Sequence, residues 1–376
     1  MIIGVPQETF PGERRVALVP AIIPSLSKAG FVVHLQQGAG FAAGFPDQQY
    51  LDRGATIVPT REEVLAADIL LQVRAAGANP DAGRADLPRL RPGQFVIGLC
   101  DPLGEPKVIE EVAARGVTLF ALELLPRITR AQSMDVLSSQ AMVAGYRAAL
   151  LAAITLPKMF PMMMTAAGTI TPAKVLVVGA GVAGLQAIAT SHRLGGIVSA
   201  YDVRPAVKEQ VQSLGAKFVE MPLETAGAET KGGYAQEMGE EFYRKQRELM
   251  ARVVAESDAV ITTAAVPGKK APVLVTTAMV EGMAPGSLVV DLAAERGGNC
   301  EVTRAGETVT HHGVTILGPL NLPSEIPYHA SQLYAKNITT FLLSLVREGK
   351  VQLDLEDEVV RGTLVARDGK TVPPPA

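Results

Sequence analysis

A glycine-rich turn near the middle of the chain has the residue spacing of a phosphate-binding loop. The run Lys174–Val178 reads as a buried strand, and Gly179, Gly181 and Gly184 follow it before a helical segment. The first glycine of such a turn permits the tight bend, the second lets backbone amides approach a pyrophosphate, and the third lets the helix pack closely on the strand. The helix N-terminus then offers free N–H groups and a positive dipole end to phosphates. These features predict a dinucleotide site.

A carboxylate stands where the ribose of such a dinucleotide is recognised. Asp202 follows the predicted strand Ile197–Tyr201, about twenty residues after the turn, where it can accept both adenosine ribose hydroxyls. A carboxylate at this place repels a 2′-phosphate, so we expect NAD(H) to be preferred over NADP(H). Arg204 is able to bind a 2′-phosphate, but we give Asp202 more weight in predicting which nucleotide is preferred. The alternative is a glycine-rich turn in a Rossmann-type fold that has lost its ligand.

Other reactive side chains point to no metal site. His311 and His312 are adjacent, and neighbours in a strand face opposite ways, so we expect an edge or a turn there. Cys100 and Cys300 lie far apart and read as reduced packing residues. Asp291 ends a predicted strand and either contacts cofactor or caps a turn.

The elements that must position these residues alternate between strands and helices, which predicts parallel α/β architecture. A long helix over Ser133–Leu156 is expected to link two such series. Strands of the first series are predicted at Ile2–Val5, Phe31–Leu35, Thr56–Val58, Ile69–Val73, Phe95–Leu99 and Thr118–Ala121. Further strands of the second are predicted at Lys217–Val219, Ala259–Thr262, Leu288–Val290 and Val314–Ile316, before a helix over Pro327–Val346 and a C-terminal hairpin with a loose tail over Gln352–Pro375.

Length and composition indicate a two-domain globular protein. The chain has 376 residues, 48% of them hydrophobic, and a formal net charge of −3 that gives no reason to expect nucleic-acid binding. The most apolar segment, Ala148–Ala173, is interrupted by prolines and is too short on either side of Lys158 to span a membrane. We expect a buried helix followed by an irregular apolar loop. We also expect no signal peptide, because the first strand begins without a basic region and a long apolar stretch.

Several segments together resemble the alanine dehydrogenase and transhydrogenase superfamily. They are the opening run from Pro6 through Gly12, Arg15 and Leu18, then Gln37–Gly40 and Ala43–Asp47, and the resemblance covers nearly the whole chain. It implies two Rossmann-like, doubly wound parallel-sheet domains, the second inserted into the first. The implied first domain comprises residues 1–135 plus 327–376, and the NAD(H)-binding domain residues 136–326.

The segment from Pro126 to Gln140 closely resembles the Arg–Gln–Asp loop of the transhydrogenase NAD(H)-binding component. In that family the loop lies over the nicotinamide. The resemblance implies that Arg127, Asp135 and Ser138 fix the carboxamide and ribose, and that Gln132 reaches toward the partner nucleotide. The alternative is a capped helix start, with Ser133 or Asp135 near its N-terminus, and one segment can serve both purposes.

The same resemblance implies further nucleotide contacts. The segment Thr230–Met238 resembles the family's mobile loop, whose alternative is an ordinary flexible surface loop. The contacts implied from this loop, from the Arg–Gln–Asp loop and from the nucleotide-binding domain are Ile128, Thr129, Val182, Val203, Arg204, Gly233, Tyr234, Gln246, Ala264 and Ala265.

The function that the resemblance implies is that of the NAD(H)-binding subunit of a proton-translocating transhydrogenase. Hydride would pass directly between NAD(H) here and NADP(H) on a partner subunit. The chain would form a homodimer and lie in the cytoplasm, peripheral to the cell membrane through membrane-embedded partner subunits.

Two other functions compete with this one. Alanine dehydrogenases carry a lysine and a histidine after two first-domain strands, where this chain has Gln72–Arg74 and Leu99–Asp101. The missing side chains argue against reductive amination, which needs a proton donor near the carbonyl. A non-catalytic NAD(H)-binding module is the remaining alternative.

Overall fold

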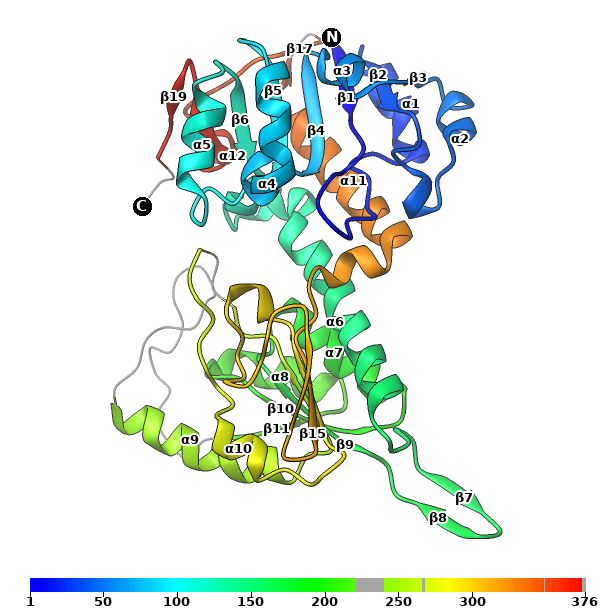
Figure 1. Cartoon of the computed structure of the whole chain (residues 1–376), viewed down its shortest axis with the longest axis vertical. Coiled ribbons are helices and arrows are strands. Elements are labelled where there is room, and N and C mark those ends of the chain that lie inside the picture. Colours follow the sequence, from blue (N-terminus) through cyan, green and yellow to red (C-terminus); the bar gives the residue numbers. More distant parts are fainter. Residues whose placement is uncertain (221–239, 266–267, 348, 374–376) are drawn as a thin grey trace. The chain divides into compact units, whose positions relative to one another are not determined.

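The computed structural model describes residues 1–220, 240–265, 268–347 and 349–373. The chain divides into two compact units, the first made of Met1–Gln140 and Pro323–Ala376, the second of Ala141–Leu322. Each unit is a largely parallel sheet with helices on both faces (Figure 1). The second unit is inserted into the first, so the predicted fold class is confirmed. Among the helices of the described ranges, none is both long enough and apolar enough to cross a membrane.

The first unit contains a sheet with the Rossmann strand order. Its order is β19-β18-β6-β5-β4-β1-β2-β3, in which β1 to β6 are parallel and β18 runs antiparallel to β6. The strands are β1 (Ile2–Val5), β2 (Val32–Gln36), β3 (Thr56–Val58), β4 (Ile69–Arg74), β5 (Phe95–Leu99), β6 (Thr118–Ala121), β18 (Leu364–Arg367) and β19 (Lys370–Thr371). The order reverses between β1 and β4.

Two apolar layers cover this sheet. The helices are α1 (Ile23–Lys28), α2 (Asp47–Leu51), α3 (Arg61–Leu65), α4 (Pro80–Gly83), α5 (Pro106–Ala113), α11 (Pro327–Ser344) and α12 (Glu358–Thr363). Residues of α1 and α11 share one core with Ile3 and Ile97, and residues of α3 and α5 share the other with Leu70 and Val96. Pro24 lies in the first turn of α1, where a missing N–H costs nothing.

The second unit repeats the Rossmann order. Its sheet runs β11-β10-β9-β12-β13-β15-β14, parallel except for β14, and the order reverses between β9 and β12. The strands are β9 (Lys174–Val178), β10 (Ile197–Tyr201), β11 (Lys217–Phe218), β12 (Ala259–Thr262), β13 (Leu288–Asp291), β14 (Thr308–His311) and β15 (Val314–Leu317).

Alternation along these strands sends side chains to two cores. Val175 and Val177 pack with α6 (Val136–Thr155), α7 (Val182–Arg193) and α8 (Lys208–Ser213). Leu176 and Val178 pack with α9 (Glu240–Ala255) and α10 (Thr277–Glu281). Runs that are apolar at every position are what a sheet buried on both faces requires.

Three sequence-based expectations need correction. The loop expected after the buried helix contains a hairpin, β7 (Met163–Thr165) and β8 (Gly168–Ile170), which projects from the second unit with every strand residue exposed (Figure 1). The C-terminal segment forms α12 before the expected hairpin, and a short hairpin of β16 (Val346–Arg347) and β17 (Lys350–Val351) precedes it. The long helix begins at Val136, because Thr129–Met134 adopts a 3-10 turn.

Candidate functional site

The glycine turn lies at the point where the strand order of the second unit reverses. Gly179 directly follows β9 and has a φ of +99°, and a Cβ atom there would lie 2.6 Å from the Thr263 hydroxyl. A Cβ atom on Gly184 would lie 1.8 Å from the carbonyl oxygen of Gly179. Both positions therefore require glycine, the first for the bend and the second for contact between helix and turn.

Gly181 differs from its two neighbours because the space around it is open. It is the N-cap of α7, and a Cβ atom there would meet no atom of the described residues within 4 Å. No side chain in that part of the chain caps the helix, so the amides of its first turn have no partner inside the helix. Open space in front of free amides and a positive helix end suits an anionic phosphate.

Asp202 is held by the backbone of the glycine turn and by Arg204. Its Oδ2 accepts a 2.7 Å hydrogen bond from the amide of Ala180, so the carboxylate ties the end of β10 to the turn. The guanidinium of Arg204 donates to both carboxylate oxygens, at 2.9 and 2.8 Å. Asp202 is thus placed beside the glycine turn and is already paired with Arg204.

The loop after β12 is fixed by Asn299, a residue that no sequence motif singles out. Its Oδ1 accepts from the amide of Ala264 at 2.9 Å, and its Nδ2 donates to the carbonyl of Ala264 at 2.8 Å. Thr263 donates from its hydroxyl to the carbonyl of Gly179 at 3.1 Å. These bonds hold the loop against the glycine turn.

Asp291 caps the turn that carries Asn299. Of the two roles expected for Asp291, contact with a cofactor or capping of a turn, the structure shows the second. Its side chain is fully buried and accepts from the hydroxyls of Thr262 and Thr303. It also accepts from three backbone amides, those of Ala293, Asn299 and Cys300. A carboxylate with five donors is a structural anchor, and it positions Asn299.

The remaining predicted residues of the second unit differ in exposure. Val182, on the first turn of α7, and Ala265 are exposed, and Val203 is half-buried beside Asp202. Gln246 is buried on α9 and donates to the Tyr201 hydroxyl at 2.9 Å. It bonds to the neighbour of Asp202 in the chain, Tyr201, and not to Asp202 itself. Burial raises the pKa of Tyr201 to about 12. Gly233 and Tyr234 lie outside the described residues.

The Arg–Gln–Asp loop belongs to the first unit and forms the start of α6. Oδ1 of Asp135 accepts from the amide of Ser138 at 2.9 Å, and Oδ2 accepts from its hydroxyl at 2.5 Å. Asp135 therefore caps the helix. Arg127, Thr129 and Gln132 are exposed on the preceding turn, and Ile128 is half-buried against the core.

A buried ionic cluster occupies the carboxyl edge of the first sheet. Arg15 donates to Glu13 from Nε at 2.8 Å and from Nη2 at 2.6 Å, and to Gln140 from Nη1 at 2.9 Å. Burial alone would lower the pKa of Arg15, but the Glu13 carboxylate keeps it above the ordinary value. Burial raises the pKa of Glu8 to about 7, and Glu13 adds to the effect. Burial likewise raises the pKa of Glu123 to about 7.

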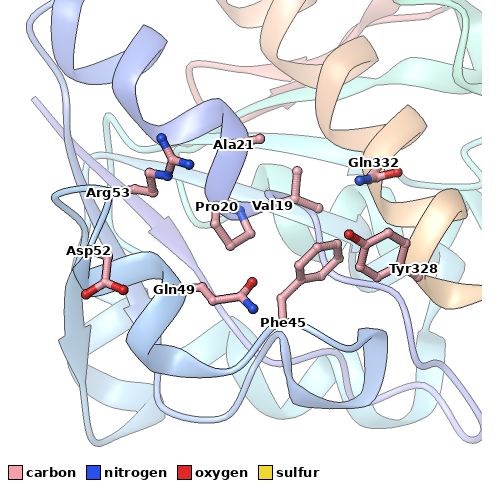
Figure 2. A pocket seen from close by; sticks show the side chains of 9 residues that line it. All are labelled: Val19, Pro20, Ala21, Phe45, Gln49, Asp52, Arg53, Tyr328 and Gln332. Carbon is pink, nitrogen blue, oxygen red and sulfur yellow. The ribbon is translucent and has the colours of Figure 1, made fainter.

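A cavity in the first unit is lined by none of the predicted site residues. It measures about 390 Å³, and Figure 2 shows the aromatic rings of Phe45 and Tyr328 side by side at its wall. Their centroids lie 4.6 Å apart. The lining is completed by Val19, Pro20, Ala21, Gln49, Asp52, Arg53 and Gln332. None of these residues was predicted to contact nucleotide.

No cluster of three or more His, Cys, Asp or Glu residues in the described ranges is arranged to hold a metal ion. His311 ends strand β14, and His312 follows in the left-handed region with a φ of +51°. The pair therefore lies at a strand end and turn, as the sequence indicated.

Comparisons with known proteins show similarity to one family over nearly the whole chain. The N-terminal domain model of alanine dehydrogenase/PNT matches residues 4–144, and the C-terminal domain model matches residues 148–374. The chain is 48% identical to the first part of NAD(P) transhydrogenase subunit alpha of Rhodospirillum rubrum, over 100% of this chain and 98% of that one. It is 27% identical to the alanine dehydrogenase of Bacillus subtilis, over 98% and 92% of the two chains. A crystal structure of transhydrogenase from Sinorhizobium meliloti is similar with a TM-score of 0.88 and 46% identity, over 99% and 100% of the chains.

Proposed function

The chain belongs to the alanine dehydrogenase/PNT family, and on that basis we propose that it is the NAD(H)-binding subunit of a proton-translocating transhydrogenase. The observation that carries the proposal is the full-length similarity to a protein named as the first part of NAD(P) transhydrogenase subunit alpha. Hydride passes directly between NAD(H) on this chain and NADP(H) on a partner subunit, and the partners couple this transfer to proton movement.

The second unit supplies the dinucleotide site. The pyrophosphate lies in front of Gly181 and the first-turn amides of α7, where the structure leaves open space. Asp202 recognises the adenosine ribose, and Gly179 and Gly184 keep the turn tight. Val182, Val203, Arg204, Ala264 and Ala265 border the same carboxyl edge of the sheet, which is where Rossmann folds bind ligands. Gln246 supports this edge through Tyr201.

The Arg–Gln–Asp loop of the first unit serves the nicotinamide end of the nucleotide. Arg127 and Ser138 orient the carboxamide, and Gln132, which carries both a donor and an acceptor, contacts the partner's nucleotide. Asp135 is held in one orientation by Ser138, so it is a fixed negative charge suited to a ring that becomes positive as hydride leaves. No general acid or base is needed, because no proton is exchanged when hydride moves between two nicotinamides.

The first unit argues against the alternative of an alanine dehydrogenase. The positions of the dehydrogenase lysine and histidine fall at the carboxyl ends of β4 and β5, in Gln72–Arg74 and Leu99–Asp101, and neither range contains that residue.

The proposed assembly is a homodimer docked on membrane-embedded partner subunits at the cytoplasmic face. Exposed methionines in the β7–β8 hairpin and just before it support the dimer: Met162, Met163 and Met164 are 59%, 41% and 77% exposed. Apolar side chains gathered on a projecting hairpin favour burial against a second copy of the chain. Light scattering tests this directly, because Met164→Glu should shift the protein toward monomer.

The nucleotide site is tested by a pair of glycine substitutions. Gly181→Ala places a methyl group in the open space before α7, so it should weaken NADH binding at least tenfold without lowering the unfolding temperature. Gly282→Ala is the matched control, because its Cβ atom would make only ordinary contacts of 3.4 Å or more. Unchanged NADH affinity in Gly181→Ala would contradict the proposed phosphate site.

The enzymatic role is tested by reconstitution. The purified chain should bind NADH and transfer hydride to NADP⁺ only after an NADP(H)-binding transhydrogenase component is added. Turnover of alanine with NAD⁺ by the chain alone would show a dehydrogenase instead. NADH binding without turnover in any pairing would show a non-catalytic module.

A further inference from the structure

The carboxylate of Asp202 already accepts four hydrogen bonds, two of them from the side chain of Arg204. A carboxylate offers about four lone-pair positions for hydrogen bonds, two on each oxygen. Oδ1 accepts from the amide and from Nε of Arg204, both at 2.9 Å. Oδ2 accepts from the amide of Ala180 at 2.7 Å and from Nη2 of Arg204 at 2.8 Å. The Asp202 side chain is 6% exposed and the Arg204 side chain 15%.

Only one of these groups is able to leave. The amides of Ala180 and Arg204 are part of the backbone that shapes the turn, whereas the Arg204 guanidinium is at the end of a flexible side chain. Two ribose hydroxyls need two acceptor positions, and the guanidinium holds two. The number of positions that the ribose requires therefore equals the number that Arg204 occupies.

We propose that Arg204 is an internal competitor for the ribose site, whose guanidinium leaves Asp202 when the adenosine ribose binds. This inference deepens the proposed function and depends on it. Arg204 then lowers the affinity for NAD(H) while it keeps the free carboxylate paired. A weakened complex suits a subunit that must exchange oxidised for reduced nucleotide at every turnover, because tight ground-state binding would slow release.

The role differs from that of a receptor for a 2′-phosphate. A receptor would strengthen NADPH binding and leave NADH binding unchanged. A competitor weakens NADH binding, and it acts only while Asp202 is present to hold it.

The experiment compares NADH and NADPH affinities by calorimetry in a double-mutant cycle. Arg204→Met removes the donors and keeps an unbranched side chain, and it should tighten NADH binding about tenfold, which corresponds to ~1.4 kcal/mol. The same substitution in an Asp202→Asn background should change NADH affinity less than twofold, because that background has no carboxylate for Arg204 and the ribose to compete for. NADPH binding should not improve. Arg193→Met removes an exposed arginine from α7 of the same unit and should leave both affinities unchanged.

Arg204→Lys gives a second measurement if Arg204→Met proves unstable. An ammonium cannot donate to both carboxylate oxygens with the geometry of a guanidinium, so NADH binding should tighten about threefold. Weaker or unchanged NADH binding in these variants overturns the proposal, as does a loss confined to NADPH or an equal gain without Asp202. If the wild-type chain binds no NADH, the proposed function itself fails, and that result is distinct from all the others.

Discussion

Replacing Glu123 by glutamine should make the first unit more resistant to alkaline pH. The Glu123 carboxyl group is enclosed where β5 and β6 end. Its Oε1 accepts from the amides of Cys100 and Asp101, and its Oε2 is buried with no hydrogen-bond partner among the described residues. Burial raises its pKa from 4.5 to about 7, against the opposing effect of those backbone bonds.

The direction in which stability changes with pH depends on which state, folded or unfolded, keeps the Glu123 proton. Between pH 4.5 and 7 the unfolded chain releases this proton and the folded chain keeps it. The stability that Glu123 contributes is therefore complete below pH 4.5 and is lost as the pH rises through 7. At 1.36 kcal/mol for each pKa unit, the loss is ~3 kcal/mol. Glu123→Gln keeps the Oε1 acceptor and carries no charge, so it escapes this loss.

The assay is urea unfolding followed by far-UV circular dichroism at several pH values. Amide exchange of β6 assigns the transition to the first unit. Wild type and Glu123→Gln should agree within about 1 kcal/mol at pH 5, and the variant should be more stable by ~3 kcal/mol at pH 8.5. Glu8, whose pKa is also about 7, remains in both proteins and cancels from the difference. Glu110→Gln changes an exposed carboxylate on α5 and should shift stability by at most ~0.5 kcal/mol at either pH.

A constant difference between the two proteins from pH 5 to pH 8.5 would refute this reasoning, because a buried carboxyl group with a raised pKa must give a pH-dependent difference. A stability advantage of Glu123→Gln over wild type that grows as the pH falls would refute the predicted direction of the pH dependence.

Two further predictions concern the second unit and the chemical step. Asp291→Asn faces several backbone amides with a side chain that has only one acceptor oxygen, so it should destabilise the second unit by about 3 kcal/mol. Thermal unfolding measures this, and a loss below 1 kcal/mol would argue against the anchoring role. Gln132→Asn should slow single-turnover hydride transfer roughly tenfold more than it weakens NADH binding, because a shorter arm misplaces the two rings. Label from C4-deuterated NADH should appear in NADPH, and its appearance in water would exclude direct transfer.

Local patterns along the chain were enough to predict most of the strands and the tight glycine turn after β9. The predicted bounds of β1, β5, β9, β10 and β12 match the structure residue for residue. Strands buried on both faces are short continuous apolar runs, a pattern that is local in the chain and bounded by turn residues. The glycines are equally local, since the bend at Gly179 and the contact at Gly184 involve residues only five apart.

Segments with a weak local pattern were assigned wrongly or left without structure. The β7–β8 hairpin consists of two short exposed strands that mix methionine and isoleucine with threonine and glycine. Such strands show neither the alternation of a half-buried strand nor the continuous apolar run of a buried one. Helix α12 has only six residues, too few to show a period, and it is fixed by packing of Val359 and Val360 on the first core.

The pairing of the charged side chains, in contrast, depends on the folded chain. Asp202 and Arg204 are neighbours in sequence, but the count of acceptors on Asp202 includes the amide of Ala180, 22 residues away. Arg15 donates a hydrogen bond to Gln140, which is 125 residues away in the chain. The pKa of Glu123 is set by the elements that exclude water from it, and desolvation is a property of the folded surroundings that no local spacing of residues encodes.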